Sequence, residues 1–111
     1  MNEEMREIRN KHLLNYAALI NQDKNIPTII CGDLNITPWS FNYKQLVEKA
    51  DLKSTRQGFG LLASWPSQLP YRIPIDHCLI TSQFGIYKTQ VLPSVNSDHL
   101  PMINEIFLKN F

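Results

Sequence analysis

Three short apolar runs, each about the length of a β-strand, are interrupted or ended by ionisable side chains in this chain of 111 residues. The polar points are Asp33 with Asn35, Asp76 with His77, and Asp98 with His99. Because strand ends converge at one edge of a sheet, residues that are far apart in the sequence can share one site there. The three points therefore predict a single constellation of carboxylates, an amide and an imidazole.

The first half of the chain predicts a helix, a strand and a second helix. Apolar residues recur at helical spacing from Asn2, which suits an N-cap, as far as Ile20. Residues 27–31 form a short, β-branched run that is typical of a strand buried on both faces. Thr37 followed by Pro38 favours the start of a second, shorter helix.

The second half predicts an irregular, proline-rich loop over residues 53–74 and then several strands. The strand-like runs cover residues 75–81, 85–92 and 101–108. The turn at residues 82–85 is suited to joining the first two runs as an antiparallel hairpin. We expect one α+β domain over residues 1–111, with one mainly antiparallel sheet and helices on one face. Nothing in the chain is expected to cover the other face.

The charge balance argues against one broad class of function. The chain has 11 Lys and Arg residues against 10 Asp and Glu residues, which gives a formal net charge of +1. Dedicated nucleic-acid binders usually carry a clear basic excess or a basic stripe. Non-specific capture of a polyanion is therefore not the expected purpose, whereas a small phosphoester or a locally bound nucleic acid remains open.

The cysteines and the chain start bear on the cellular compartment. Cys31 and Cys78 lie inside apolar runs without a CxxC spacing, which predicts reduced core residues and no disulfide or zinc site. The polar, acidic start is not a signal peptide, and no apolar run reaches membrane-spanning length. We expect a soluble, cytoplasmic chain, unless a segment that precedes it carries a targeting signal.

Each polar point also has a purely structural explanation. Segment 32–35, taken alone, is slightly more typical of an ordinary turn after a strand. Asp76 is equally consistent with a solvated carboxylate and with one that orients an imidazole. His77 should point to the opposite face of its strand, so we leave it out of the site. Asp98 and His99 fit either a polar turn or a metal-binding carboxylate beside a proton-accepting imidazole.

Taken together, the motifs resemble the C-terminal half of the endonuclease/exonuclease/phosphatase superfamily. They are Gly32-Asp33-Leu34-Asn35, Ile75-Asp76-His77 and Ser97-Asp98-His99-Leu100-Pro101. Segment 32–40 and Ser64-Trp65-Pro66 are similar to a bacterial branch of it. The resemblance covers nearly the whole chain. It implies half of a four-layer α/β/β/α sandwich and hydrolysis of phosphoesters in nucleic acids, lipids or small molecules with Mg²⁺ or Mn²⁺.

The resemblance also implies a role for each of five residues. His99 corresponds to the base that activates water, and Asp76 to the carboxylate that orients its imidazole. Asp98 corresponds to a carboxylate of the metal site. Asp33 and Asn35 correspond to the pair that positions the nucleophile and contacts the phosphoryl oxygens.

Aromatic and basic residues near these motifs are further candidates for the substrate site. Tyr71 and Arg72 lie just before the Asp76 strand, and aromatic rings stack on bases while arginine pairs with phosphate. We expect both to lie at the lip of the site. Trp39 and Trp65 are expected to belong to the core instead.

The chain departs from the family pattern at two points. Family members take an asparagine and a metal-binding glutamate from the N-terminal half, and nothing in residues 1–25 matches them. Leu100 stands where arginine is common. We therefore expect an incomplete phosphodiesterase or nuclease, completed by a separate N-terminal half or by pairing as a homodimer. The alternative is a catalytically inactive remnant or an interaction module that self-associates through its exposed sheet face.

Overall fold

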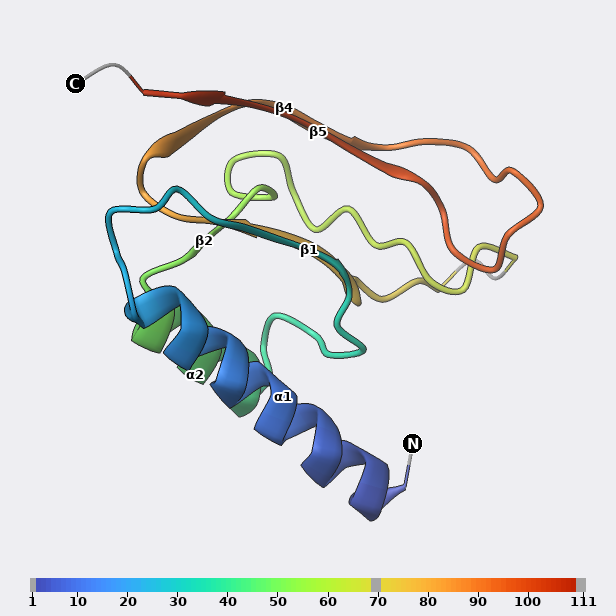
Figure 1. Cartoon of the computed structure of the whole chain (residues 1–111). Helices are drawn as coiled ribbons and strands as arrows, with labels where there is room; N and C mark the ends of the chain where they lie inside the picture. Colours follow the sequence, from blue (N-terminus) through green and yellow to red (C-terminus); the bar gives the residue numbers. More distant parts are fainter. Residues whose placement is uncertain (1, 69–70, 110–111) are drawn as a thin grey trace.

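A computed structural model of the chain describes residues 2–68 and 71–109, and within them it contains two helices and five strands (Figure 1). The elements are α1 (Glu3–Asn21), β1 (Ile29–Asp33), α2 (Phe41–Ala50), β2 (Lys53–Ser54), β3 (Asp76–Ile80), β4 (Phe84–Val91) and β5 (Met102–Leu108). The predicted α+β class is confirmed.

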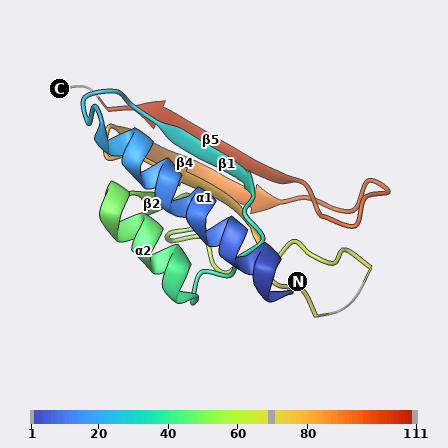
Figure 2. The ribbon, with the colours of Figure 1, turned by 60° about the horizontal axis from the view of Figure 1, so that its bottom comes forward.

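The strands form two antiparallel ladders. The first has the order β1-β3-β2, with β3 in the centre, and the second consists of β4 and β5. Helices α1 and α2 lie side by side on one face of the first ladder, and the β4–β5 ribbon lies over the opposite face (Figures 1 and 2). The hydroxyl of Thr55 connects the two ladders by a 2.6 Å hydrogen bond to Oδ1 of Asn104. The described chain thus has three layers: helices, sheet and sheet.

Two expectations about the strands are wrong. The chain turns away from the first ladder after Thr81, so β4 does not form a hairpin with β3 and pairs with β5 instead. The resulting ribbon supplies the cover that the face opposite the helices was expected to lack. Apolar runs predict that strands form, but the packing of one layer on another decides which strands pair.

Helix α1 begins as its sequence predicts. Oδ1 of Asn2 accepts a 2.8 Å hydrogen bond from the amide of Met5, which satisfies one of the unpaired donors of the first turn. Three residues, Leu13, Ala17 and Ile20, are buried against the rest of the chain. Among the described residues, neither helix has the length and apolar character that crossing a bilayer requires.

Helix α2 begins later than predicted. The amide of Ser40 donates to the carbonyl of Thr37 at 3.1 Å, so Thr37 and Pro38 form a turn and the helix starts at Phe41. Proline fixes the backbone angle of a turn as readily as that of a first helical residue, which explains the error. Trp39 lies in this turn with 57% of its surface exposed, and it is not a core residue.

The main core lies between the two helices and the first ladder. Its members are apolar side chains from all three elements, chiefly Leu13, Ala17, Ile20, Leu46, Ala50 and Leu79. Leu79 of β3 is fully buried, because β3 has a strand on each side and a layer on each face. The core therefore fixes β3 most firmly of the five strands.

The two cysteines form a disulfide, which corrects the expectation of reduced thiols. Cys31 and Cys78 are direct partners across β1 and β3, with their Cα atoms 4.1 Å apart. They are 47 residues apart in the sequence, and only the register of the two strands brings the sulfurs together.

Truncating the central side chain of β3 should cost far more stability than truncating an exposed one on α1. Leu79→Ala leaves a cavity in the core and should lower the free energy of unfolding by about 2–5 kcal/mol. Leu19→Ala removes a side chain that is 62% exposed and should change it by less than about 0.5 kcal/mol. Urea unfolding measures both, and equal effects would contradict the described core.

Candidate active site

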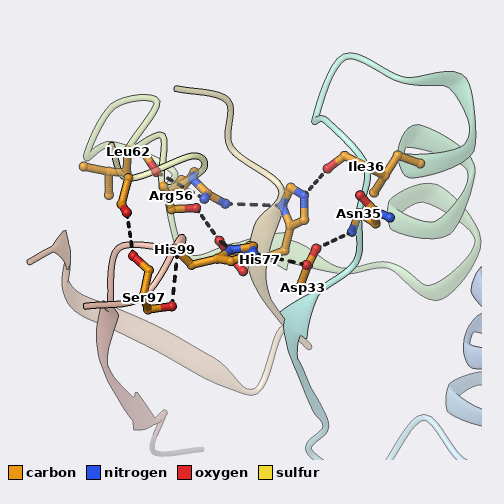
Figure 3. Close-up of polar contacts among 11 residues, drawn as sticks. Asp33, Asn35, Ile36, Arg56, Leu62, His77, Ser97 and His99 are labelled. Atoms are coloured by element: carbon orange, nitrogen blue, oxygen red, sulfur yellow. Dashed lines mark hydrogen bonds and ion pairs between the residues drawn. The ribbon is translucent and has the colours of Figure 1, made fainter. Parts of the chain in front are cut away.

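The predicted polar points converge at one end of the first ladder (Figure 3). Asp33 ends β1 and Asp76 begins β3, and the two are direct partners in the antiparallel register. His99 comes from the loop that precedes β5. We refer to Asp33, Asp76 and His99 as the Asp–His cluster.

Asp76 holds the imidazole of His99. Oδ2 of Asp76 lies 2.7 Å from Nδ1 of His99, and because a carboxylate only accepts, Nδ1 carries the proton and donates it. The hydroxyl of Ser64 donates to the same oxygen at 2.5 Å. This pairing leaves Nε2 as the nitrogen of His99 that is available for proton transfer.

Ser64 is a site residue whose role the sequence does not reveal. It is fully buried, and its carbonyl accepts a 2.8 Å hydrogen bond from the amide of Leu100, in the loop that carries His99. Its amide bonds the carbonyl of Ile73 near the start of β3. The one local signal is a hydroxyl directly before Trp65-Pro66 in a brief extended segment.

Asp33 faces the free nitrogen of His99. Nε2 of His99 lies 3.6 Å from Oδ2 of Asp33, whose other oxygen accepts a 2.8 Å hydrogen bond from the amide of Asn35. Asn35 has a left-handed backbone with φ of 54°, so the chain turns sharply here. A water molecule or an ester oxygen between His99 and Asp33 would contact the imidazole, the carboxylate and the backbone turn at Asn35.

The surroundings of His99 make it a stronger base. The hydrogen bond to Asp76 raises the pKa of His99 above its ordinary value, and the negative charges of Asp76, Asp33 and Asp98 act in the same direction. Burial opposes this effect, but the imidazole remains partly exposed. The neutral imidazole therefore takes up a proton more readily than a free histidine does.

The Asp–His cluster fits part of a divalent cation site. One ligand atom from each of its three residues lies within 4.8 Å of the others, and carboxylate oxygens are the donors that Mg²⁺ and Mn²⁺ prefer. Oδ2 of Asp76 is already used by Ser64 and His99. Asp33, whose side chain is 44% exposed, is thus the most open carboxylate, and a complete site needs further ligands.

Besides Asn35, which joins the cluster through its backbone amide, three predicted site residues lie outside the Asp–His cluster. Asp98 is exposed, and its backbone carbonyl accepts a hydrogen bond from the amide of Ser67. Tyr71 is 82% exposed, and Nη2 of Arg72 donates to the carbonyl of Ser67 at 2.9 Å. In the described ranges, no hydrogen bond or ion pair joins these three side chains to the cluster, and their roles remain predictions.

The sequence comparison identifies the family. Residues 2–99 match the model of the endonuclease/exonuclease/phosphatase family, so the chain belongs to this family. A comparison with curated proteins finds no match. The resemblance that the three motifs predicted is therefore confirmed.

Solved structures share the fold. An endonuclease/exonuclease/phosphatase family protein of Bacteroides thetaiotaomicron matches with a TM-score of 0.78 and 19% identity, over 94% of this chain and 46% of its own. A mannosyl-6-phosphatase of the same species matches with a TM-score of 0.74 and 20% identity, over 97% of this chain and 48% of its own. An endonuclease/exonuclease/phosphatase of Bacteroides vulgatus matches with a TM-score of 0.75 and 21% identity, over 93% of this chain and 45% of its own. The chain thus spans less than half the length of these structures.

The pKa of His99 should fall when its partner loses its charge. Asp76→Asn keeps the shape of the side chain but removes the carboxylate that stabilises the imidazolium. The raised pKa of His99 means that the imidazole is neutral only at higher pH, and the variant should become neutral at lower pH. An NMR titration of the His99 ring protons in EDTA measures the shift. An unchanged or higher midpoint would contradict the hydrogen bond.

Proposed function

We propose that this chain is the C-terminal half of a divalent-metal-dependent phosphoester hydrolase and supplies its general base. The Asp76–His99 pair, with Nε2 of His99 directed toward Asp33, is the single observation that carries the proposal. In this role, Nε2 takes a proton from the attacking water while Asp76 holds the ring and stabilises the imidazolium.

The proposed reaction is hydrolysis of the ester by a water molecule that His99 deprotonates. The hydroxide formed at His99 attacks phosphorus, the ester P–O bond breaks, and the leaving oxygen takes a proton from solvent. Asp33 and the side-chain amide of Asn35 orient the nucleophile and the phosphoryl oxygens. Mg²⁺ or Mn²⁺, held by Asp33 and in our proposal by Asp98, would offset the negative charge of the phosphoester.

A small phosphoester is our preferred substrate class. The formal net charge of +1 offers little attraction for long duplex DNA. The structurally similar mannosyl-6-phosphatase suggests a sugar phosphate as one candidate. A nucleic-acid end or a lipid headgroup presents the same phosphoester. Tyr71 and Arg72 are the side chains that we propose for contacts beyond the phosphorus.

A second polypeptide surface is proposed to complete the site. Helix α1 and strand β1 line two open hollows of about 360 and 340 Å³, and apolar side chains such as Ile8, Leu19 and Ile29 are exposed there. Strand β1 lies at the edge of its ladder, where a strand from a partner can pair. A separate N-terminal half or a second copy of this chain would fit this surface.

Hydrolysis of a chromogenic phosphodiester tests the proposal directly. We expect the chain, either self-associated or combined with a separate N-terminal half, to show turnover that requires Mg²⁺ or Mn²⁺, disappears with EDTA, and falls by about 10²–10⁴-fold in His99→Ala. Tyr87→Ala is the control, because Tyr87 is an exposed residue of β4 outside both the Asp–His cluster and the two hollows. A sugar phosphate, a nucleotide and duplex DNA assayed in parallel identify the substrate class. Turnover that is equal in wild type and His99→Ala would contradict the proposed base.

The alternative function is an inactive module that self-associates through its apolar surface. The exposed residues of α1 and β1 favour it, because contiguous apolar surface of this kind marks interaction sites. Light scattering of the purified chain should then give the mass of a dimer. Leu19→Lys should convert the dimer to a monomer, whereas Tyr87→Lys, at an exposed position of β4, should not. A folded wild-type monomer would exclude this alternative.

A further inference from the structure

The residue after Asp76 reaches the site from the other face of β3. His77 is only 2% exposed, and side chains alternate between faces along a strand. Nε2 of His77 lies 2.6 Å from the carbonyl oxygen of Ile36, in the segment that follows Asp33 and Asn35 (Figure 3). Asp76 and His77, which are consecutive in β3, therefore contact His99 and the segment that follows Asp33, respectively.

Arg56 determines which nitrogen of His77 carries the proton. Nη1 of Arg56 lies 3.2 Å from Nδ1 of His77, and because a guanidinium only donates, Nδ1 must accept. The proton therefore sits on Nε2, which donates to the carbonyl of Ile36. Burial, the largest effect, lowers the pKa of His77, and the Arg56 charge acts in the same direction. The hydrogen bond to the carbonyl of Ile36 and the charges of Asp76 and Asp33 oppose it.

Arg56 is itself fixed in place. Its Nε donates to the carbonyl of Leu61 at 2.8 Å, and its Nη2 donates to the carbonyl of Leu62 at 3.2 Å. The ring of Tyr43 packs near the imidazole, with its centroid 5.0 Å from that of His77. The imidazole therefore has little freedom to rotate or to change partners.

The contacts of His77 bear on the segment that carries Asp33. This segment turns through the left-handed Asn35, and it is held by the amide of Leu34, which bonds the carbonyl of Ile75, and by His77 beyond the turn. We propose that His77 and Arg56 are positioning residues that fix the turn and thereby the distance between Asp33 and His99. This inference rests on the proposed hydrolase function.

The tautomer of His77 provides a test that does not depend on activity. A long-range ¹H–¹⁵N spectrum of the chain near neutral pH should show a proton on Nε2 of His77 and none on Nδ1. In Arg56→Met, which removes the donor, this preference should weaken. A proton on Nδ1, or a doubly protonated ring, in the wild-type chain would overturn the proposal.

Two substitutions at His77 separate positioning from simple packing. His77→Phe keeps a ring but removes both hydrogen bonds, so the amide of Asn35 should exchange about fivefold to tenfold faster, on the scale of one lost hydrogen bond. The amides of Leu79 and Ile80 report whether the fold is intact. His77→Gln offers an amide that can donate to Ile36, and it should restore slow exchange. Equal exchange in all three proteins would overturn the proposal.

Measurements of kcat and KM separate the positioning role of His77 from the proposed hydrolase function. Where the wild-type protein hydrolyses phosphoesters, His77→Phe should lower kcat about tenfold or more with little change in KM, and His77→Gln should recover most of it. A loss of kcat that Gln does not recover would overturn the positioning role. A completed wild-type assembly that is inactive, with the expected tautomer and exchange, would instead refute the hydrolase and leave the positioning role of His77 in the fold intact.

Discussion

The antiparallel pairing of β1 with β3 sets the geometry of the whole site. It places Asp33 directly opposite Asp76, at the end of the ladder where the His99 loop arrives. Strand β3 is central and its apolar side chains are buried, so the carboxylate that orients His99 is attached to the most firmly packed strand. Precise positioning of this kind is what general base catalysis requires.

The polar site and the exposed apolar surface are neighbours, because one hollow is lined by Ile8 as well as by Asp33 and Asn35. In the Asp–His cluster, Asp76 accepts the hydrogen bond of His99, and Asp33 is the most open carboxylate. The apolar side chains of α1 and β1 remain exposed beside it, and the family structures are about twice as long as this chain. In our account, one partner surface would both cover these side chains and add the ligands that the site needs.

The sequence predicted the features that depend on local chemistry. The cap of α1 at Asn2 and the existence of β1, β3, β4 and β5 follow from local patterns, whereas β2 lies in a segment that was expected to be a loop. The pairing of Asp76 with His99 joins distant segments, and it was predicted from the three motifs and their family resemblance. The partner of β4, the disulfide and the role of Ser64 were not predicted, because each depends on contacts between distant segments. The predicted start of α2 at Thr37 and Pro38 was wrong, because a turn and the start of a helix favour the same residue types.

Manganese titration of the isotope-labelled chain would locate the proposed metal site, because the paramagnetic ion broadens the NMR signals of the residues that bind it. We expect the amides of Asp33, Asp76 and His99 to broaden first, and Asp33→Asn to remove the effect. Broadening that is no stronger at the cluster than at Glu3 and Glu4, the exposed acidic residues at the start of α1, would contradict the claim that these side chains form a metal-dependent phosphoester site.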